Sequence, residues 1–176
     1  MLIGISGKMG VGKTTAARHM YLMNNNVHVK SFGTPLKEVA KMFLGDLDLT
    51  SQEVKRLVLG SEWNNPEPMT VRDFLQKLGT DAIRTGLHPD AWVNMLFKDY
   101  SNQHWVIDDV RFPNEYDAIK LRGGLVVRVN RDNIPVSDHP SETSLDDYEF
   151  DFVINNNGAR DEFLAHVGKL WRQYGI

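Results

Sequence analysis

The most informative absences in this 176-residue chain are cysteine and any long apolar run. A chain without cysteine forms no disulfide and has no thiolate nucleophile, which weakly favours a cytoplasmic enzyme. No apolar stretch approaches the roughly 20 residues of a membrane span. The first residues run into a glycine-rich segment without the basic and apolar regions of a signal peptide. We therefore expect a cytoplasmic location and no membrane partner.

An excess of basic residues is also lacking, because the formal net charge is −3. Proteins that clamp a nucleic-acid backbone derive their affinity mainly from lysine and arginine, so no nucleic-acid partner is expected. A nucleotide ligand needs only a few cations in a pocket, which an acidic protein can supply. With 41% hydrophobic residues the chain can bury one substantial core, so we predict a single domain with inserted parts.

A phosphate-binding loop follows the first apolar run. Residues 7–14 fit the P-loop pattern G-x-x-x-x-G-K-S/T, and the apolar run 2–5 precedes them as a strand would. Glycines let successive N–H groups surround an anion, and a helix beginning near Lys13 adds the positive end of its dipole. Lys13 is expected to reach the β- and γ-phosphates, and the Thr14 hydroxyl to hold Mg²⁺. The predicted ATP-binding residues of this segment are Gly7, Lys8, Gly10, Val11, Gly12, Lys13, Thr14 and Thr15.

Strand-like and helix-like segments alternate along the chain, which predicts an α/β fold with a parallel sheet covered on both faces. The predicted strands cover residues 2–5, 27–32, 104–109, 125–129 and 152–154. Between the second and third strands, residues 36–100 are predicted to be wholly helical. This stretch is too long for a simple crossover, and an insertion at the carboxyl edge of a parallel sheet is where a substrate pocket is expected.

Two carboxylates end the third predicted strand. A P-loop protein places an acid there to bind Mg²⁺ directly or through water. Because side chains alternate along a strand, only one of the two can point at the loop. We favour Asp109, with Asp108 as the alternative.

Arginines are the next candidates, because phosphoryl transfer between two nucleotides needs cations around the acceptor phosphate and the transferred group. The candidates are Arg72, Arg84, Arg111 and Arg131, each of which could instead be a solvated surface residue. Arg111 follows the acidic strand end directly. His139 is not required as a base, because a phosphate oxygen is already a good nucleophile once positioned. Trp92 is either a core residue or a contact to a base.

The order of several short segments resembles the bacteriophage-type deoxynucleoside monophosphate kinases, within the P-loop nucleoside monophosphate kinase superfamily. The resemblance covers nearly the whole chain. Besides the P-loop, the matching segments are 32–38, 72–81 with Arg84, 90–92, 109–115, 139–142 and 153–158. If the protein is phage-encoded, its location would be the host cytoplasm.

The resemblance implies a P-loop kinase fold with a five-stranded parallel sheet in the order 2-3-1-4-5. The core would comprise residues 1–35, 101–130 and 148–176, with a monophosphate-binding insertion at 36–100 and a short lid at 131–147 that excludes water. The implied substrate contacts are Phe32, Lys37, Arg72, Gln76, Arg84, Trp92 and Arg111. Asn157, Gly158 and Arg160 would lie near the donor adenine. The catalytic residues would be Lys13, Asp109, Arg111 and Arg131, and the metal ligands Thr14 and Asp109.

The expected reaction is transfer of the γ-phosphate of ATP, with Mg²⁺, to a deoxynucleoside monophosphate. The partners would be these small molecules, and a homodimer is left open. Phosphomevalonate and dephospho-coenzyme A are rival acceptors, since their kinases share some of the same segments. A non-catalytic nucleotide-binding switch is the remaining alternative. The sequence has no Asn-Lys-x-Asp segment for guanine recognition, which disfavours a GTPase-like switch.

Overall fold

The computed structural model describes residues 1–135 and 138–174, which fall into two compact units. Unit 1 comprises Met1–Phe32 with the described part of Leu96–Ile176, and unit 2 comprises Gly33–Met95. The predicted lid at 131–147 includes residues 136–137, which lie outside the described residues. Within the described ranges, no helix combines the length and apolarity needed to cross a membrane.

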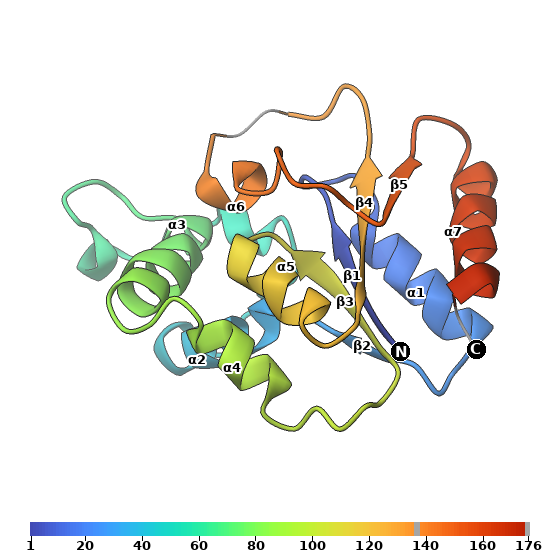
Figure 1. The fold of residues 1–176 in the computed structure, drawn as a ribbon. Helices are drawn as coiled ribbons and strands as arrows, with labels where there is room; N and C mark the ends of the chain where they lie inside the picture. The colour runs from blue at the N-terminus through green and yellow to red at the C-terminus, as the bar shows by residue number, and fades with distance from the viewer. Residues whose placement is uncertain (136–137, 175–176) are drawn as a thin grey trace. The chain divides into compact units, whose positions relative to one another are not determined.

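Unit 1 is built on a five-stranded parallel sheet (Figure 1). The strands are β1 (Leu2–Ser6), β2 (His28–Lys30), β3 (Trp105–Val110), β4 (Leu125–Asn130) and β5 (Phe152–Asn155). Their spatial order is β2-β3-β1-β4-β5, as predicted. Strand β3 extends one residue beyond the predicted end, to Val110, so Asp108 and Asp109 are not its last two residues.

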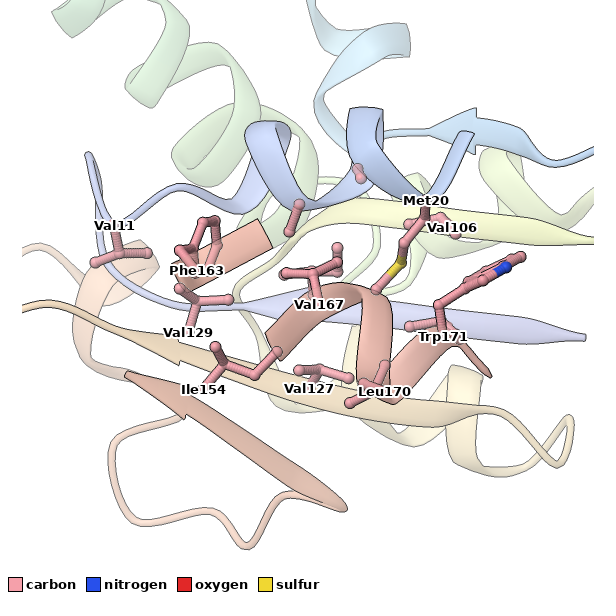
Figure 2. Close-up of a cluster of buried hydrophobic side chains, with 14 of the residues drawn as sticks. Val11, Met20, Val106, Val127, Val129, Ile154, Phe163, Val167, Leu170 and Trp171 are labelled. Carbon is pink, nitrogen blue, oxygen red and sulfur yellow. The ribbon is translucent and has the colours of Figure 1, made fainter. Parts of the chain in front are cut away.

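The main core lies between the sheet and two helices, α1 (Lys13–Met23) and α7 (Arg160–Tyr174). These helices pack against each other on one face of the sheet (Figures 1 and 2). Ile3 and Ile5 of β1 are fully buried in this cluster. Because side chains alternate along a strand, Gly4 faces the opposite side, where Ile119 of α5 (Pro113–Lys120) approaches. A Cβ at Gly4 would lie 2.6 Å from Ile119 Cδ1. Helix α5 therefore covers the second face.

The chain leaves unit 1 after Phe32 and returns near Phe97, and these two aromatic rings are in contact. Their centroids are 6.1 Å apart in an edge-on arrangement. Phe97 also stacks on Trp105 of β3, with centroids 6.0 Å apart, and the Arg122 guanidinium lies 4.1 Å above its ring. The residues at which the chain leaves and re-enters unit 1 are therefore held by contacts within unit 1.

Unit 2 contains several helical segments around a small apolar core. They are α2 (Gly33–Leu44), 3₁₀ turns at Val54–Arg56 and Ser61–Trp63, α3 (Val71–Gln76), a π-helix at Lys77–Thr85, and the first part of α4 (Ala91–Phe97). The core is formed by Ala40, Leu49, Val71, Phe74 and Leu75.

The prediction that residues 36–100 are wholly helical is wrong, because an antiparallel bridge pairs Val58 with Thr70. Leu59 N donates to Met69 O at 2.8 Å and Val71 N donates to Leu57 O at 2.9 Å. The bridge ends where α3 begins. There the Thr70 and Asp73 side chains cap the helix by exchanging hydrogen bonds with each other's backbone N–H, and the Thr70 hydroxyl also donates to Asp73.

Candidate active site at the phosphate-binding loop

The loop between β1 and α1 has backbone conformations that only glycine adopts without strain. Gly7 has a φ of 144°, and a Cβ there would lie 2.4 Å from the carbonyl oxygen of Val129 in β4. Gly12 has a φ of 109°, and its Cβ would lie 2.8 Å from Asn156 Nδ2. Helix α1 starts directly after Gly12, so its N-terminal N–H groups and positive dipole end adjoin the loop. This geometry is that of an anion-binding site.

Lys13 lies folded against the loop that it follows. Its side chain is only 8% exposed, and Nζ donates to Gly7 O at 2.6 Å and to Lys8 O at 2.8 Å. Burial, together with the nearby Arg111 guanidinium, lowers the pKa of Lys13 from 10.5 to about 8. Three carboxylates oppose this pKa shift: Glu142, Asp109 and Asp108. Lys13 is thus mainly cationic at neutral pH but held in a low-dielectric site.

The carboxylate that pairs with Thr14 is Asp108, since Thr14 Oγ1 donates to Asp108 Oδ2 at 2.8 Å. Asp109 accepts instead from Ser31 Oγ at 2.5 Å and from Phe32 N at 2.7 Å, just after β2. Thr14 therefore pairs with Asp108, the alternative, rather than with the favoured Asp109, and the assignment of a Mg²⁺ ligand stays a prediction. The register of β3 against β1 is irregular at this point, since Gly4 pairs with Ile107 but Ser6 pairs with Val110, so strict alternation does not assign the faces of the two carboxylates.

Thr14 and Asp108 together offer a hydroxyl and a carboxylate at the start of α1. Hard divalent cations such as Mg²⁺ take oxygen ligands of this kind and keep several waters. The donor set in the structure therefore fits Mg²⁺.

Arg111 and the end of β3 are held by a buried carboxylate of α5. The backbone N–H groups of Arg111 and Phe112 donate to Glu115 Oε2 at 2.8 and 3.1 Å, and Glu115 is 2% exposed. The side chain of Arg111 contacts α6 (Pro140–Thr143): its Nη1 donates to Ser141 O at 3.3 Å and pairs with Glu142. Arg111 thus links the strand end to this short helix.

Replacing Glu115 with Ala is expected to lower the free energy of unfolding by about 2–3 kcal/mol, because two buried backbone donors lose their acceptor. Glu115→Gln keeps one carbonyl oxygen as an acceptor and should cost less. Urea unfolding monitored by tryptophan fluorescence measures both. A loss of less than about 0.5 kcal/mol for Glu115→Ala, the range of an ordinary surface substitution, would contradict this capping role.

Helix α6 and the residue positions after it bring onto the loop acidic side chains that were not among the predicted site residues, although Glu142 belongs to the matching segment 139–142. Met9 N donates to Glu142 Oε2 at 2.7 Å. Asp146, just after α6, pairs with Lys8 Nζ at 3.1 Å and with Arg128 Nη2 at 2.7 Å. His139 has a structural place, since its Nδ1 accepts from Ser141 N at 3.1 Å and caps α6.

The turn after β5 also touches the loop, through a residue next to those predicted. Asn156 Nδ2 donates to Val11 O at 2.8 Å. Asn157 instead pairs with Asp132, donating from Nδ2 at 2.7 Å and accepting from the Asp132 backbone N–H at 2.8 Å. Among the other predicted residues of this region, Gly158 precedes α7, Arg160 begins it, and Arg131 is exposed after β4.

The predicted acceptor contacts lie mainly in unit 2. Arg72 Nη2 donates to Gln52 Oε1 at 2.8 Å, and Arg84 Nη1 donates to Pro89 O at 3.3 Å. Trp92 is 4% exposed and its indole N–H donates to Gly79 O at 2.9 Å, which favours the core interpretation over a base contact. The remaining predicted residues are the half-buried Lys37 and Gln76, on α2 and α3, and Phe32, which is buried in unit 1.

Unit 2 also has an open cavity of about 540 Å³ with a mainly aromatic and apolar wall. The predicted acceptor residues lie elsewhere in unit 2, so sequence reasoning did not point to this cavity. Its lining residues are Phe43, Trp63, Met69, Phe74, Lys77, Leu78, Asp81 and Ala82.

Comparison with known proteins identifies related sequences. Residues 44–167 match the family model described as deoxynucleotide monophosphate kinase. A protein of Acanthamoeba polyphaga mimivirus, for which deoxynucleotide monophosphate kinase activity is proposed, is 34% identical over 95% of this chain and 94% of its own length. The deoxynucleotide monophosphate kinase of Enterobacteria phage T4 is 29% identical over 59% of this chain, and that of Escherichia phage RB69 is 26% identical over 72%. These matches span about half of each phage protein, 46% and 53%.

Solved structures with a similar fold include two shikimate kinases. The enzyme of Acinetobacter baumannii superposes with a TM-score of 0.55 at 15% identity, over 98% of this chain and 94% of the other. The enzyme of Aquifex aeolicus gives a TM-score of 0.53 at 12% identity, over 98% and 97%. At this level of identity the similarity establishes the P-loop kinase fold and nothing about the acceptor.

Proposed function

The chain belongs to the deoxynucleotide monophosphate kinase family, and we propose on that premise that it transfers the γ-phosphate of ATP to a deoxynucleoside monophosphate. The products would be ADP and the deoxynucleoside diphosphate. The observation that carries the proposal is the match to the mimivirus relative over 95% of the chain, because a match of that extent includes unit 2 together with nearly all of the rest of the chain. A match to the loop alone would support only nucleoside triphosphate binding.

The loop and α1 would bind the phosphates of ATP. Backbone N–H groups of the loop and the Lys13 ammonium would neutralise the β- and γ-phosphates, and the 2.8 Å pair of Thr14 and Asp108 would hold Mg²⁺. When bound, this ion neutralises charge on the phosphate oxygens. Asn156, which donates to Val11 O at 2.8 Å, would keep the loop in its curved shape.

Arg111 would act on the transferred phosphoryl group. Phosphoryl transfer depends on positioning and on neutralising charge, so a fixed guanidinium contributes more than a base would. The backbone of Arg111 is fixed by the buried Glu115, and its side chain is 28% exposed. Of the other predicted residues, Arg131 would supply a further cation, and Asn157, Gly158 and Arg160 would lie near the adenine of ATP.

The acceptor would be bound by unit 2. Lys37, Arg72, Gln76 and Arg84 combine cationic and amide donors, which suit a monophosphate and a base. Arg72 and Arg84 already donate to Gln52 and Pro89, so an acceptor phosphate would replace these contacts with charge-assisted ones.

A coupled assay of ADP formation tests the proposed reaction. Purified protein with ATP and Mg²⁺ would be given each deoxynucleoside monophosphate in turn, and separately phosphomevalonate and dephospho-coenzyme A. We expect at least one deoxynucleoside monophosphate to stimulate ADP formation, and neither of the other acceptors to do so. Stimulation by phosphomevalonate or dephospho-coenzyme A alone would overturn the acceptor assignment.

A further inference from the structure

One carboxylate in unit 1 contacts several groups that would otherwise bind phosphate. Glu142 Oε2 accepts from the loop N–H of Met9 at 2.7 Å, and Glu142 Oε1 pairs with the Arg111 guanidinium. The Glu142 side chain is only 11% exposed. It is also near enough to Lys13 to oppose, through its charge, the lowering of the Lys13 pKa. A loop amide, an arginine and the loop lysine therefore surround the same carboxylate.

This arrangement has the chemistry of a bound phosphate. A carboxylate presents two anionic oxygens that accept hydrogen bonds from backbone N–H and guanidinium groups, as two phosphate oxygens do. Lys13 Nζ meanwhile donates to the carbonyls of Gly7 and Lys8, which are contacts within its own loop. An incoming triphosphate would need the Met9 amide and Arg111, and both are already engaged by Glu142.

The segment that carries Glu142 is anchored, so the contact does not depend on a single side chain. Leu145 is 2% exposed, and Asp146 pairs with both Lys8 and Arg128. Arg128 is itself 11% exposed and lies on β4 beside the loop strand β1. These contacts hold the segment that carries Glu142 beside the loop.

We propose that Glu142 is an internal competitor of the ATP phosphates, occupying the phosphate position of the loop until nucleotide displaces its carboxylate and frees Arg111. The inference rests on the proposed binding of ATP by the loop and is independent of the identity of the acceptor. Removing the charge should therefore strengthen ATP binding, whereas a carboxylate that only oriented Arg111 for catalysis would leave ATP affinity unchanged or weaken it.

Isothermal titration of Glu142→Gln with ATP, ADP and adenosine tests the proposal. We expect the Kd for ATP to fall about 10-fold, the effect of removing one charge-assisted competitor. The decrease should be smaller for ADP and absent for adenosine, because only phosphates compete with the carboxylate. Glu142→Ala should give the same pattern, with tighter binding of ATP, a smaller effect on ADP and none on adenosine, which shows that the effect is not specific to the glutamine amide.

The matched control is Glu149→Gln, which removes the same charge from an exposed side chain. The hydrogen bond from Tyr116 goes to the backbone carbonyl of Glu149, which the substitution leaves in place. It should leave all three affinities unchanged. Unchanged or weaker ATP binding in Glu142→Gln, or an equal gain for adenosine, would overturn the proposed competition while leaving the kinase assignment intact. Failure of the wild-type protein to bind ATP would overturn the proposed function itself, and with it this inference.

Discussion

Replacing Lys13 with Met is expected to lower turnover about 1,000-fold, the effect of removing a principal charge-stabilising donor from an enzyme site. The same substitution should make the protein more stable at pH 7. Methionine fills the space of the lysine stem without a buried ammonium, and Lys13 is only 8% exposed. Loss of activity with a gain in stability separates a functional cation from a structural one.

The pKa of Lys13 gives the size and the pH range of this stability effect. Its folded-state pKa of about 8 lies below the ordinary lysine value of 10.5, so the folded state disfavours the charged form. Multiplying this difference in pKa by 1.36 kcal/mol per unit gives an upper bound of about 3 kcal/mol for the gain in the free energy of unfolding. The variant also loses the hydrogen bonds to Gly7 O and Lys8 O, which reduces the expected gain to about 1–2 kcal/mol. The cost of the charge applies fully below pH 8. Between pH 8 and 10.5 the unfolded state binds more protons, so wild-type stability rises relative to the variant.

Urea unfolding of both proteins at pH 7 and pH 10, alongside the coupled ADP assay, measures these effects. The stability advantage of Lys13→Met should be largest at pH 7 and smaller at pH 10. Lys169→Met, which changes an exposed lysine of α7, is the control and should affect neither activity nor stability appreciably. If Lys13→Met unfolded more easily than wild type at pH 7, the ammonium would be a net stabilising group.

Replacing Asp108 with Asn should lower kcat by about 100-fold or more and raise the Mg²⁺ concentration needed for half-maximal activity. The Asp108 carboxylate is the group that lies 2.8 Å from Thr14 Oγ1. An amide oxygen is a weaker ligand for a hard cation than a carboxylate oxygen, and the negative charge is lost. Titrating activity with Mg²⁺ at saturating substrates measures both changes.

Asp109→Asn is the matched comparison, since it makes the same chemical change one residue away. Asp109 accepts from Ser31 and Phe32, so its loss should mainly lower stability at the end of β2 and leave the Mg²⁺ midpoint near the wild-type value. The reverse pattern, in which Asp109→Asn shifts the Mg²⁺ midpoint and Asp108→Asn does not, would restore Asp109 as the metal ligand.

The two aspartates show where sequence reasoning reached its limit. The phosphate-binding loop and the sheet order were predictable, because the glycine spacing and the strand–helix alternation each have a direct physical cause. Alternation predicted that only one of the two carboxylates would face the loop, but it could not reveal the register irregularity of β3 between Ile107 and Val110, which contains both. Trp105, Val106 and Ile107 are all buried, so no polar position marked the phase of the strand.

Contacts between distant parts of the chain were also out of reach of the sequence. Glu142 and Met9 are 133 positions apart, and Asn156 and Val11 are 145 apart. Local patterning carries no information about such pairs, because they depend on how β4, β5 and the turns after them are placed. In unit 2, periodicity correctly predicted helices but missed the Val58–Thr70 bridge, whose short flanks contain no strand-like alternation.

The ring contact between Phe32 and Phe97 has a consequence for how such enzymes could diverge. A segment whose two ends are already held together loses less chain entropy on folding than one that must close its own loop. Both ends of the segment that forms unit 2 are therefore held by residues of unit 1. We therefore expect that a different sequence between the same two phenylalanines would leave the strands and the phosphate-binding loop in place.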